Sequence, residues 1–133
     1  MIGIIVTGHG SFATGLTSGL KLLVGEPEQY ETVDFDPEDS IEILTTKLKA
    51  AAARLKDCDG ILILTDLAGG SPFNVSIRLK MTADREGTAM EVIGGTNLPV
   101  VLDAYMSRTV IADAGQLAAS SSANGRQQVI HYV

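Results

Sequence analysis

The stretch IIVTGHGSF, residues 4–12, decides the fold. It begins with consecutive aliphatic residues, which is typical of a strand buried on both faces of a parallel sheet, and it ends in a glycine turn. His9 stands in that turn between Gly8 and Gly10, where a strand ends and a helix begins. Ligands of open α/β sheets usually bind at this edge, so His9 is a candidate base, ligand or nucleophile. The alternative is a histidine that only caps or fills a turn.

Short apolar runs alternate with helical patterns along the chain, which is the rhythm of a parallel sheet covered by helices. The predicted strands cover residues 1–6, 30–35, 60–64 and 90–93. The predicted helices cover residues 11–24, a segment from Pro37 to about residue 55 that is capped by Asp36, residues 71–81, and a segment opened by Asn97 and Pro99. In the tail we expect a helix over 111–119, a loop over 120–125 and a final strand over 128–133.

The composition is that of one globular domain over residues 1–133. Hydrophobic residues make up 45% and charged residues 20%, and no apolar run approaches the length of a membrane span. Met1 leads directly into strand-like sequence without a basic leader segment, which predicts a soluble, cytoplasmic protein.

Acidic residues outnumber basic ones, and the formal net charge is −6. Nucleic-acid binding needs clustered Lys and Arg that this chain lacks, so we expect no nucleic-acid partner, and a basic protein surface is the better match. The single cysteine, Cys58, cannot form an internal disulfide and has no cluster of metal ligands near it. We expect it to be structural.

A second informative stretch, TDLAGGSP over residues 65–72, follows the third strand as His9 follows the first. In a right-handed doubly wound sheet of order 2-1-3-4, strands one and three are neighbours, so His9 and Asp66 face each other. A carboxylate that accepts from one imidazole nitrogen fixes the tautomer and leaves the other nitrogen free to attack. Gly70, the Ser71 hydroxyl and the first amides of the following helix can hold an anion such as phosphate.

Each of these residues alone has an ordinary structural explanation, since an aspartate or a serine often only caps a turn or a helix. Two such loops at adjacent strand ends favour a functional site. A third glycine loop, residues 94–97, comes after the fourth strand. Two interpretations stay open: the loop lines the same cleft, or Asn97 only caps the following helix.

Three motifs in matching order and spacing, TGHGSFATG, DLAGGSPFN and GGTNLP, resemble the enzyme IIA component of the mannose-type phosphoenolpyruvate-dependent sugar phosphotransferase system, which serves mannose, fructose, sorbose or amino sugars. The resemblance covers nearly the whole chain and weakens after about Arg108. It implies that His9 accepts a phosphoryl group from the histidine-containing phosphocarrier protein and passes it to a IIB component. It also implies that Asp66 hydrogen-bonds the histidine and that Ser71 lies beside it.

The resemblance further implies a homodimer that exchanges a final antiparallel strand, which residues 128–133 would supply. The fold class is therefore α/β: a three-layer doubly wound sheet of four parallel strands in the order 2-1-3-4, a C-terminal antiparallel strand, and helices on both faces. The chain ends without a linker and a IIB domain, so we expect IIB on a separate polypeptide, with a membrane IIC/IID permease as an indirect partner. The chemistry requires no metal and no cofactor. His131 has no acidic partner in sequence and is expected to be structural or interfacial.

Other classes of protein compete with this interpretation. A receiver-like signalling domain needs an acidic pair after the first strand, where this chain has Thr7, Gly8 and His9. A nucleotide-binding domain is disfavoured because the glycine loops match neither GxGxxG nor a P-loop. A noncatalytic module that binds an anion or senses phosphorylation stays open, and in such a module replacement of His9 by alanine leaves ligand binding largely intact. Nothing in the sequence identifies the sugar.

Overall fold

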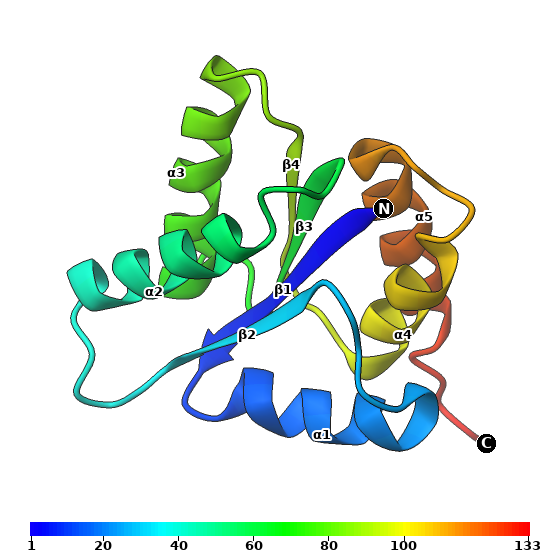
Figure 1. Ribbon diagram of the computed structural model, residues 1–133. Helices are drawn as coiled ribbons and strands as arrows, with labels where there is room; N and C mark the ends of the chain where they lie inside the picture. The colour runs from blue at the N-terminus through cyan, green and yellow to red at the C-terminus, as the bar shows by residue number, and fades with distance from the viewer.

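Four parallel strands form the centre of the computed structural model, which describes residues 1–133, and their order is β2-β1-β3-β4 (Figure 1). The α/β class and the strand order predicted from the sequence are confirmed. No helix is both long and apolar enough to cross a membrane. The strands are β1 (Ile2–His9), β2 (Tyr30–Phe35), β3 (Gly60–Thr65) and β4 (Met90–Ile93), and the helices are α1 (Phe12–Val24), α2 (Ile41–Arg54), α3 (Ser71–Arg85), α4 (Leu98–Ser107) and α5 (Ala114–Gln127).

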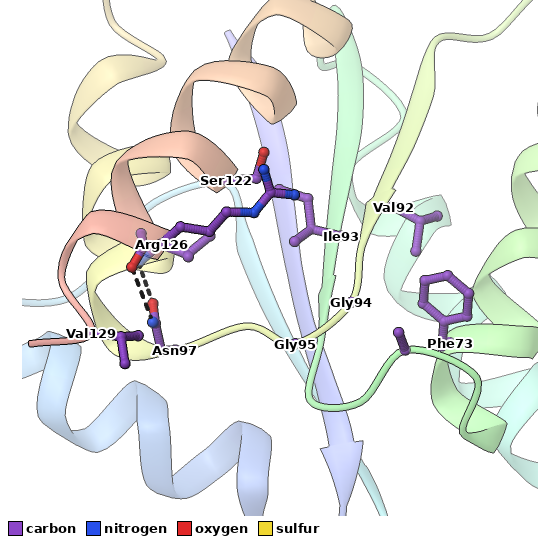
Figure 2. A pocket seen from close by; sticks show the side chains of 12 residues that line it. Phe73, Val92, Ile93, Gly94, Gly95, Asn97, Ser122, Arg126 and Val129 are labelled. Atoms are coloured by element: carbon purple, nitrogen blue, oxygen red, sulfur yellow. Dashed lines mark hydrogen bonds between the residues drawn. The ribbon is translucent and has the colours of Figure 1, made fainter.

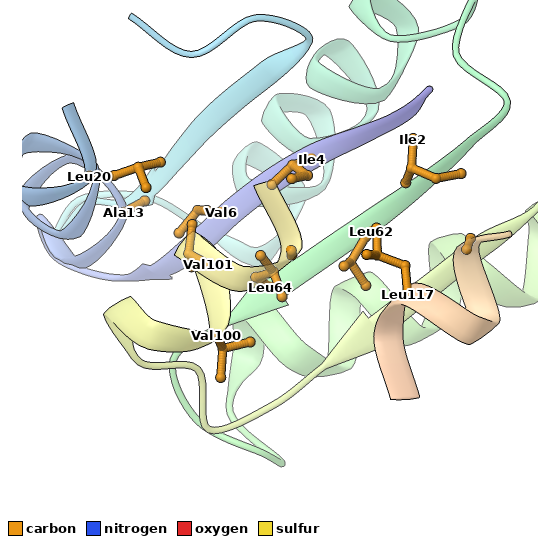
Figure 3. Close-up of a cluster of buried hydrophobic side chains, with 12 residues drawn as sticks. Ile2, Ile4, Val6, Ala13, Leu20, Leu62, Leu64, Val100, Val101 and Leu117 are labelled. Carbon is orange, nitrogen blue, oxygen red and sulfur yellow. The ribbon is translucent and has the colours of Figure 1, made fainter. Parts of the chain in front are cut away.

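The helices cover both faces of the sheet, so the molecule has three layers (Figure 1). Successive strand residues point to opposite faces, and β1 is buried on both. Ile2, Ile4 and Val6 pack in one core with α1, α4 and α5. Figure 3 shows these three side chains together with their neighbours on β3 and α4. Ile5 packs in a second core with α2 and α3. Each fully buried aliphatic side chain contributes about 1.5–3 kcal/mol, so the two cores fix β1 firmly between the helical layers.

The register of the sheet brings the carboxyl ends of β1 and β3 together. Thr7 pairs with Thr65, the last residue of β3, and β1 continues two residues further to His9. On the other side of β1, His9 pairs with Phe35 at the end of β2. After β1 the chain continues into α1 on one face of the sheet, and after β3 it continues into α3 on the other face. An open α/β sheet forms a crevice at such a point.

The C-terminal part of the chain differs from the prediction. Residues 128–133 form no strand in this single chain, and their apolar side chains are exposed. Residues 120–125, expected as a loop, belong to α5. Ser, Asn and Gly are typical of loops, but here these small residues let α5 pack closely on α4. Gly125 is buried against Val100, and Ser121 donates a hydrogen bond to Asp103.

The start of α2 also differs from the prediction. The helix begins at Ile41 rather than Pro37, and its cap is Ser40, whose hydroxyl accepts from the Ile43 amide at 3.1 Å. The expected cap, Asp36, is instead bound by Lys47, whose Nζ lies 3.1 Å from the carboxylate. This ion pair holds the preceding residues in a turn, so the helix starts one turn later.

Candidate active site at the carboxyl edge of the sheet

His9 is the last residue of β1, and the chain turns sharply after it. Gly10 has a φ of +57°, a left-handed conformation that glycine adopts without strain, and its amide donates to the Phe35 carbonyl at 2.8 Å. Helix α1 then starts at Phe12. The imidazole packs on the ring of Phe35, with centroids 5.9 Å apart, and 45% of the His9 side chain stays exposed. A partner molecule can therefore reach it.

Asp66 follows β3 and meets His9 across the gap between the two strands. Its Oδ2 accepts hydrogen bonds from His9 Nδ1 at 2.8 Å and from the His9 backbone amide at 2.9 Å. Its Oδ1 accepts from the Leu67 amide at 2.8 Å. The predicted juxtaposition of His9 and Asp66 is confirmed. Because Nδ1 donates to the carboxylate, the neutral imidazole has its free lone pair on Nε2.

Hydrogen bonds keep the Asp66 carboxylate ionised. Partial burial by itself raises the pKa of this carboxyl, but the two hydrogen bonds from His9 and the one from Leu67 outweigh it, and the pKa lies below the usual range of aspartate. The carboxylate is therefore negative at neutral pH, where it stabilises any positive charge that forms on the imidazole.

Gly8 makes room for this contact. A β-carbon at Gly8 would lie 2.9 Å from Cγ of Asp66 and would also strike the ring of Phe12. From the sequence, Gly8 is expected to let the chain turn and to leave the imidazole accessible, but a pattern of glycines cannot show which of them a neighbouring carboxylate approaches. The contribution of Phe35 was also missed, since it depends on the register between β1 and β2.

Two helices begin beside His9, and their own N-cap residues make no side-chain hydrogen bond to the helix. Ser40, Asn97 and Asp113 cap the other three helices with a side-chain oxygen. The N-caps of α1 and α3, Ser11 and Gly70, make no such hydrogen bond. At α1 the Asp34 carboxylate already accepts from the Thr14 amide at 3.1 Å, whereas α3 has no side-chain acceptor at its start. The free amides of α3 and the positive end of its dipole therefore point to this edge of the sheet, where an anion would supply the missing acceptor.

The residues predicted to hold phosphate lie at the start of α3. Gly70 is its N-cap and lies against the imidazole, and Ser71 is its first residue and is half-buried. The structure thus brings Gly70, Ser71, His9 and Asp66 to one edge, while their roles in binding phosphate remain a prediction.

The third glycine loop lies one strand further away. Gly94 packs under the loop that follows Asp66, since a β-carbon there would lie 2.8 Å from Cα of Ala68. Behind this contact is a separate cavity of about 440 Å³, over which Arg126 reaches toward Ser122 (Figure 2). His9 does not line this cavity, and Asn97 of the loop caps α4 by accepting from the Val100 amide at 2.9 Å. That the loop lines the same cleft as His9 stays a prediction.

Cys58 and His131, the single cysteine and the other histidine of the chain, lie away from His9. Burial raises the pKa of the Cys58 thiol, and its Sγ lies 3.5 Å from the side-chain oxygen of Gln29, near the amino edge of the sheet. His131 is exposed in the C-terminal segment.

Sequence comparison identifies relatives over most of the chain. The family model of the "PTS system fructose IIA component" matches residues 3–121. The mannose-specific EIIAB component of the phosphotransferase system from Escherichia coli K12 is 35% identical over 128 residues, which are 96% of this chain and 38% of that protein. The fructose-specific EIIA component from Bacillus subtilis is 29% identical over 112 residues, 84% of this chain and 74% of the relative. The chain therefore spans less than half the length of the E. coli relative.

A solved structure agrees with this result. The phosphotransferase component EIIA from Streptococcus agalactiae superposes with a TM-score of 0.90 at 30% identity, and the match covers 98% of this chain and 97% of that one. The fold described above is thus shared over its full length.

Proposed function

The chain belongs to the mannose-type IIA family of the sugar phosphotransferase system, and from this premise we propose that it is a phosphohistidine carrier. His9 accepts a phosphoryl group from the histidine-containing phosphocarrier protein and passes it to a IIB component during sugar uptake. The observation that carries the proposal is the exposed imidazole whose Nδ1 is bound by Asp66 at 2.8 Å. That contact prepares Nε2 as the nucleophile.

The transfer needs one bond to form and one to break. The lone pair of Nε2 attacks the phosphorus as the P–N bond to the donor histidine breaks, and the bonding electrons leave with the donor imidazole. The proton on Nδ1 stays in the hydrogen bond to Asp66, whose charge balances the imidazolium that forms. Transfer to IIB is the reverse process, with His9 as the leaving group.

The phosphoryl oxygens need hydrogen-bond donors, and no Lys or Arg side chain forms an ion pair with Asp66. We assign this role to the uncapped start of α3, with the Ser71 hydroxyl. The phosphoryl group on Nε2 then replaces the missing cap of α3. This arrangement holds charge without a metal.

The decisive experiment is phosphoryl transfer from phosphoenolpyruvate through enzyme I and the phosphocarrier protein, followed by intact mass. We expect one acid-labile phosphate on the wild-type chain and none on His9→Ala. His131→Ala is the matched control, because it removes the other histidine and leaves the site intact. It should be phosphorylated like the wild type.

Other outcomes identify other functions. A wild-type chain that stays unphosphorylated beside active upstream proteins contradicts the carrier proposal and favours a noncatalytic anion-binding module. Phosphate that survives His9→Ala shows that another residue is the acceptor, with Asp66 and His131 the first to test. The sugar itself is selected by the IIC/IID membrane components of such a system, so it is not encoded in this site.

We also infer a homodimer. The outer edge of β4 is unpaired, and residues 129–133 expose Val129, Ile130, Tyr132 and Val133. An unpaired strand edge and an extended apolar segment in the same chain match one another, so two copies can exchange their tails as antiparallel strands. Light scattering coupled to gel filtration tests this: the full chain should be a dimer and a variant that ends at Gln128 a monomer. Equal masses for the two would contradict the exchange.

A further inference from the structure

Gly70 lies against the edge of the His9 ring that carries Cε1. A β-carbon at Gly70 would be 2.9 Å from Cε1 and 3.6 Å from Nε2. The backbone at Gly70 has φ −77° and ψ 171°, an extended conformation that any residue adopts. Its neighbour Gly69, with φ +86°, is in the left-handed region instead. Conformation therefore explains glycine at position 69, whereas at position 70 only the space beside the imidazole does.

The loop cannot retreat to make that space. The Gly70 carbonyl accepts from the Asn74 amide at 2.8 Å, and the Gly69 carbonyl accepts from the Asn74 side chain at 3.0 Å. Both glycines are thus tied to the first turn of α3. A methyl group at position 70 would move the imidazole, which is 45% exposed, more easily than the loop.

The imidazole has three neighbours that set its orientation. Asp66 binds Nδ1, Phe35 packs with its ring plane tilted by 60°, and Gly70 lies under the Cε1 edge. A shift of the ring away from Gly70 lengthens or misaligns the hydrogen bond to Asp66, because that bond joins a ring atom to a carboxylate fixed by the His9 and Leu67 amides.

We propose that Gly70 is a positioning residue. Because it has no side chain, it leaves the space in which the His9 imidazole lies while Nδ1 is hydrogen-bonded to Asp66, and we call this space the seat. The proposal rests on the proposed function of His9 and goes further, since it separates two properties of Gly70. Its amide belongs to the uncapped end of α3 that would hold phosphate, whereas its bare Cα orients the nucleophile.

Gly70→Ala tests the seat because alanine keeps the amide and fills the space. The readout is the ¹⁵N spectrum of the neutral His9 imidazole. The wild type should show one tautomer, with Nδ1 protonated, and the variant a mixture of both. The rate of phosphoryl acceptance should fall by about a hundredfold, as expected for a nucleophile displaced by about 1 Å.

Ser71→Ala is the matched control. It removes a proposed phosphate contact one residue away and leaves the seat empty, so transfer should slow while the tautomer stays as in the wild type. If Gly70→Ala slows transfer but keeps the wild-type tautomer, the seat is refuted, and the methyl group acts on the phosphoryl group instead. A wild-type tautomer at a wild-type rate refutes the seat as well.

One measurement does not depend on the folding of a variant. The wild-type chain should show a nuclear Overhauser contact between Hε1 of His9 and the α protons of Gly70, and its absence overturns the proposal. Neither this contact nor the tautomer requires phosphoryl transfer. A chain that has both but is never phosphorylated contradicts the carrier function and leaves the seat in place.

Discussion

At the scale of single residues, one carboxylate oxygen organises the candidate site. Oδ2 of Asp66 accepts from both the backbone and the ring of His9, so it fixes the end of β1 and the imidazole in the same contact. A side chain bound in this way loses rotamer freedom before any partner arrives. The His9 imidazole is therefore oriented in the resting protein, which would lower the entropy cost of each transfer in the proposed carrier.

Asp66→Asn tests the charge of this contact. Asparagine keeps the shape of the side chain but cannot balance an imidazolium, and its amide can reverse the hydrogen-bond polarity. We expect phosphoryl acceptance by His9 to slow by at least about tenfold, because an Asp→Asn change beside a reactive imidazole can favour the wrong tautomer. Initial rates with the phosphorylated phosphocarrier protein measure this, and an unchanged rate would show that Asp66 is only structural.

The same contact predicts a pH dependence of stability. The pKa of Asp66 is lower in the folded chain than in the unfolded chain, where it is about 3.9. The contact therefore stabilises the fold fully above the unfolded pKa, and this contribution is lost as the pH falls through the folded pKa. Urea unfolding from pH 6 to pH 2.5 should show the advantage of the wild type over Asp66→Asn shrinking below about pH 4. A constant difference would contradict it.

At the scale of elements, α5 depends on small residues where it crosses α4. A β-carbon at Gly125 would collide with Val100, a buried residue near the start of α4. Gly125→Ala should therefore destabilise the protein by about 1–3 kcal/mol, the usual cost of overpacking. Gly15→Ala is the control in an exposed helix position with open space, where it should stabilise by about 1 kcal/mol.

Thermal and urea unfolding of the two variants would check both signs. In the double variant with Val100→Ala, part of the loss at Gly125 should be recovered, because the colliding side chain is gone. A destabilised Gly15→Ala would indicate a contact on α1 that the single chain does not have.

The same helix shows which elements the sequence can predict. Runs of aliphatic residues located all four strands, and β2 and β4 have the predicted bounds. Asn97 was recognised as the start of α4, where its side chain accepts from the Val100 amide. The part of α5 after residue 119 was not predicted, because Ser, Asn and Gly have weak helix propensity. These residues are stabilised as a helix by burial against α4, which is not adjacent to them in sequence.

At the scale of the whole molecule, Arg108 fastens the amino edge of the sheet. It is 4% exposed and has no carboxylate partner; its guanidinium donates to the carbonyls of Ile2, Gln29 and Glu28 and packs on the ring of Tyr105. One side chain at the end of α4 thus ties the start of β1 to the segment before β2.

Arg108→Met should lower the free energy of unfolding by roughly 2–4 kcal/mol, because methionine fills the volume but removes the hydrogen bonds to the buried Ile2 carbonyl and to the partly buried carbonyls of Glu28 and Gln29. Phosphoryl acceptance at temperatures where the variant stays folded should match the wild type, since Arg108 lies at the opposite edge from His9. Urea unfolding and the transfer assay check the two expectations, and a slower folded variant would contradict the second.

The strand order of the whole sheet could be predicted, and so could the meeting of His9 with Asp66, because both follow from how parallel strands connect. Residues 128–133 could not be placed. Their alternating pattern is that of a strand, but a strand forms only where another pairs with it, and this single chain pairs none with them.

The distance between Arg108 and His9 also has an evolutionary consequence. Under the proposed function, substitutions around the arginine alter how long the protein survives heat or proteolysis, whereas substitutions around the histidine alter which partners it serves and how fast. The two residues lie at opposite edges of the sheet, so selection can act on them separately. A lineage that moves to a warmer habitat can adjust the first while the proposed exchange of phosphate with unchanged partners continues.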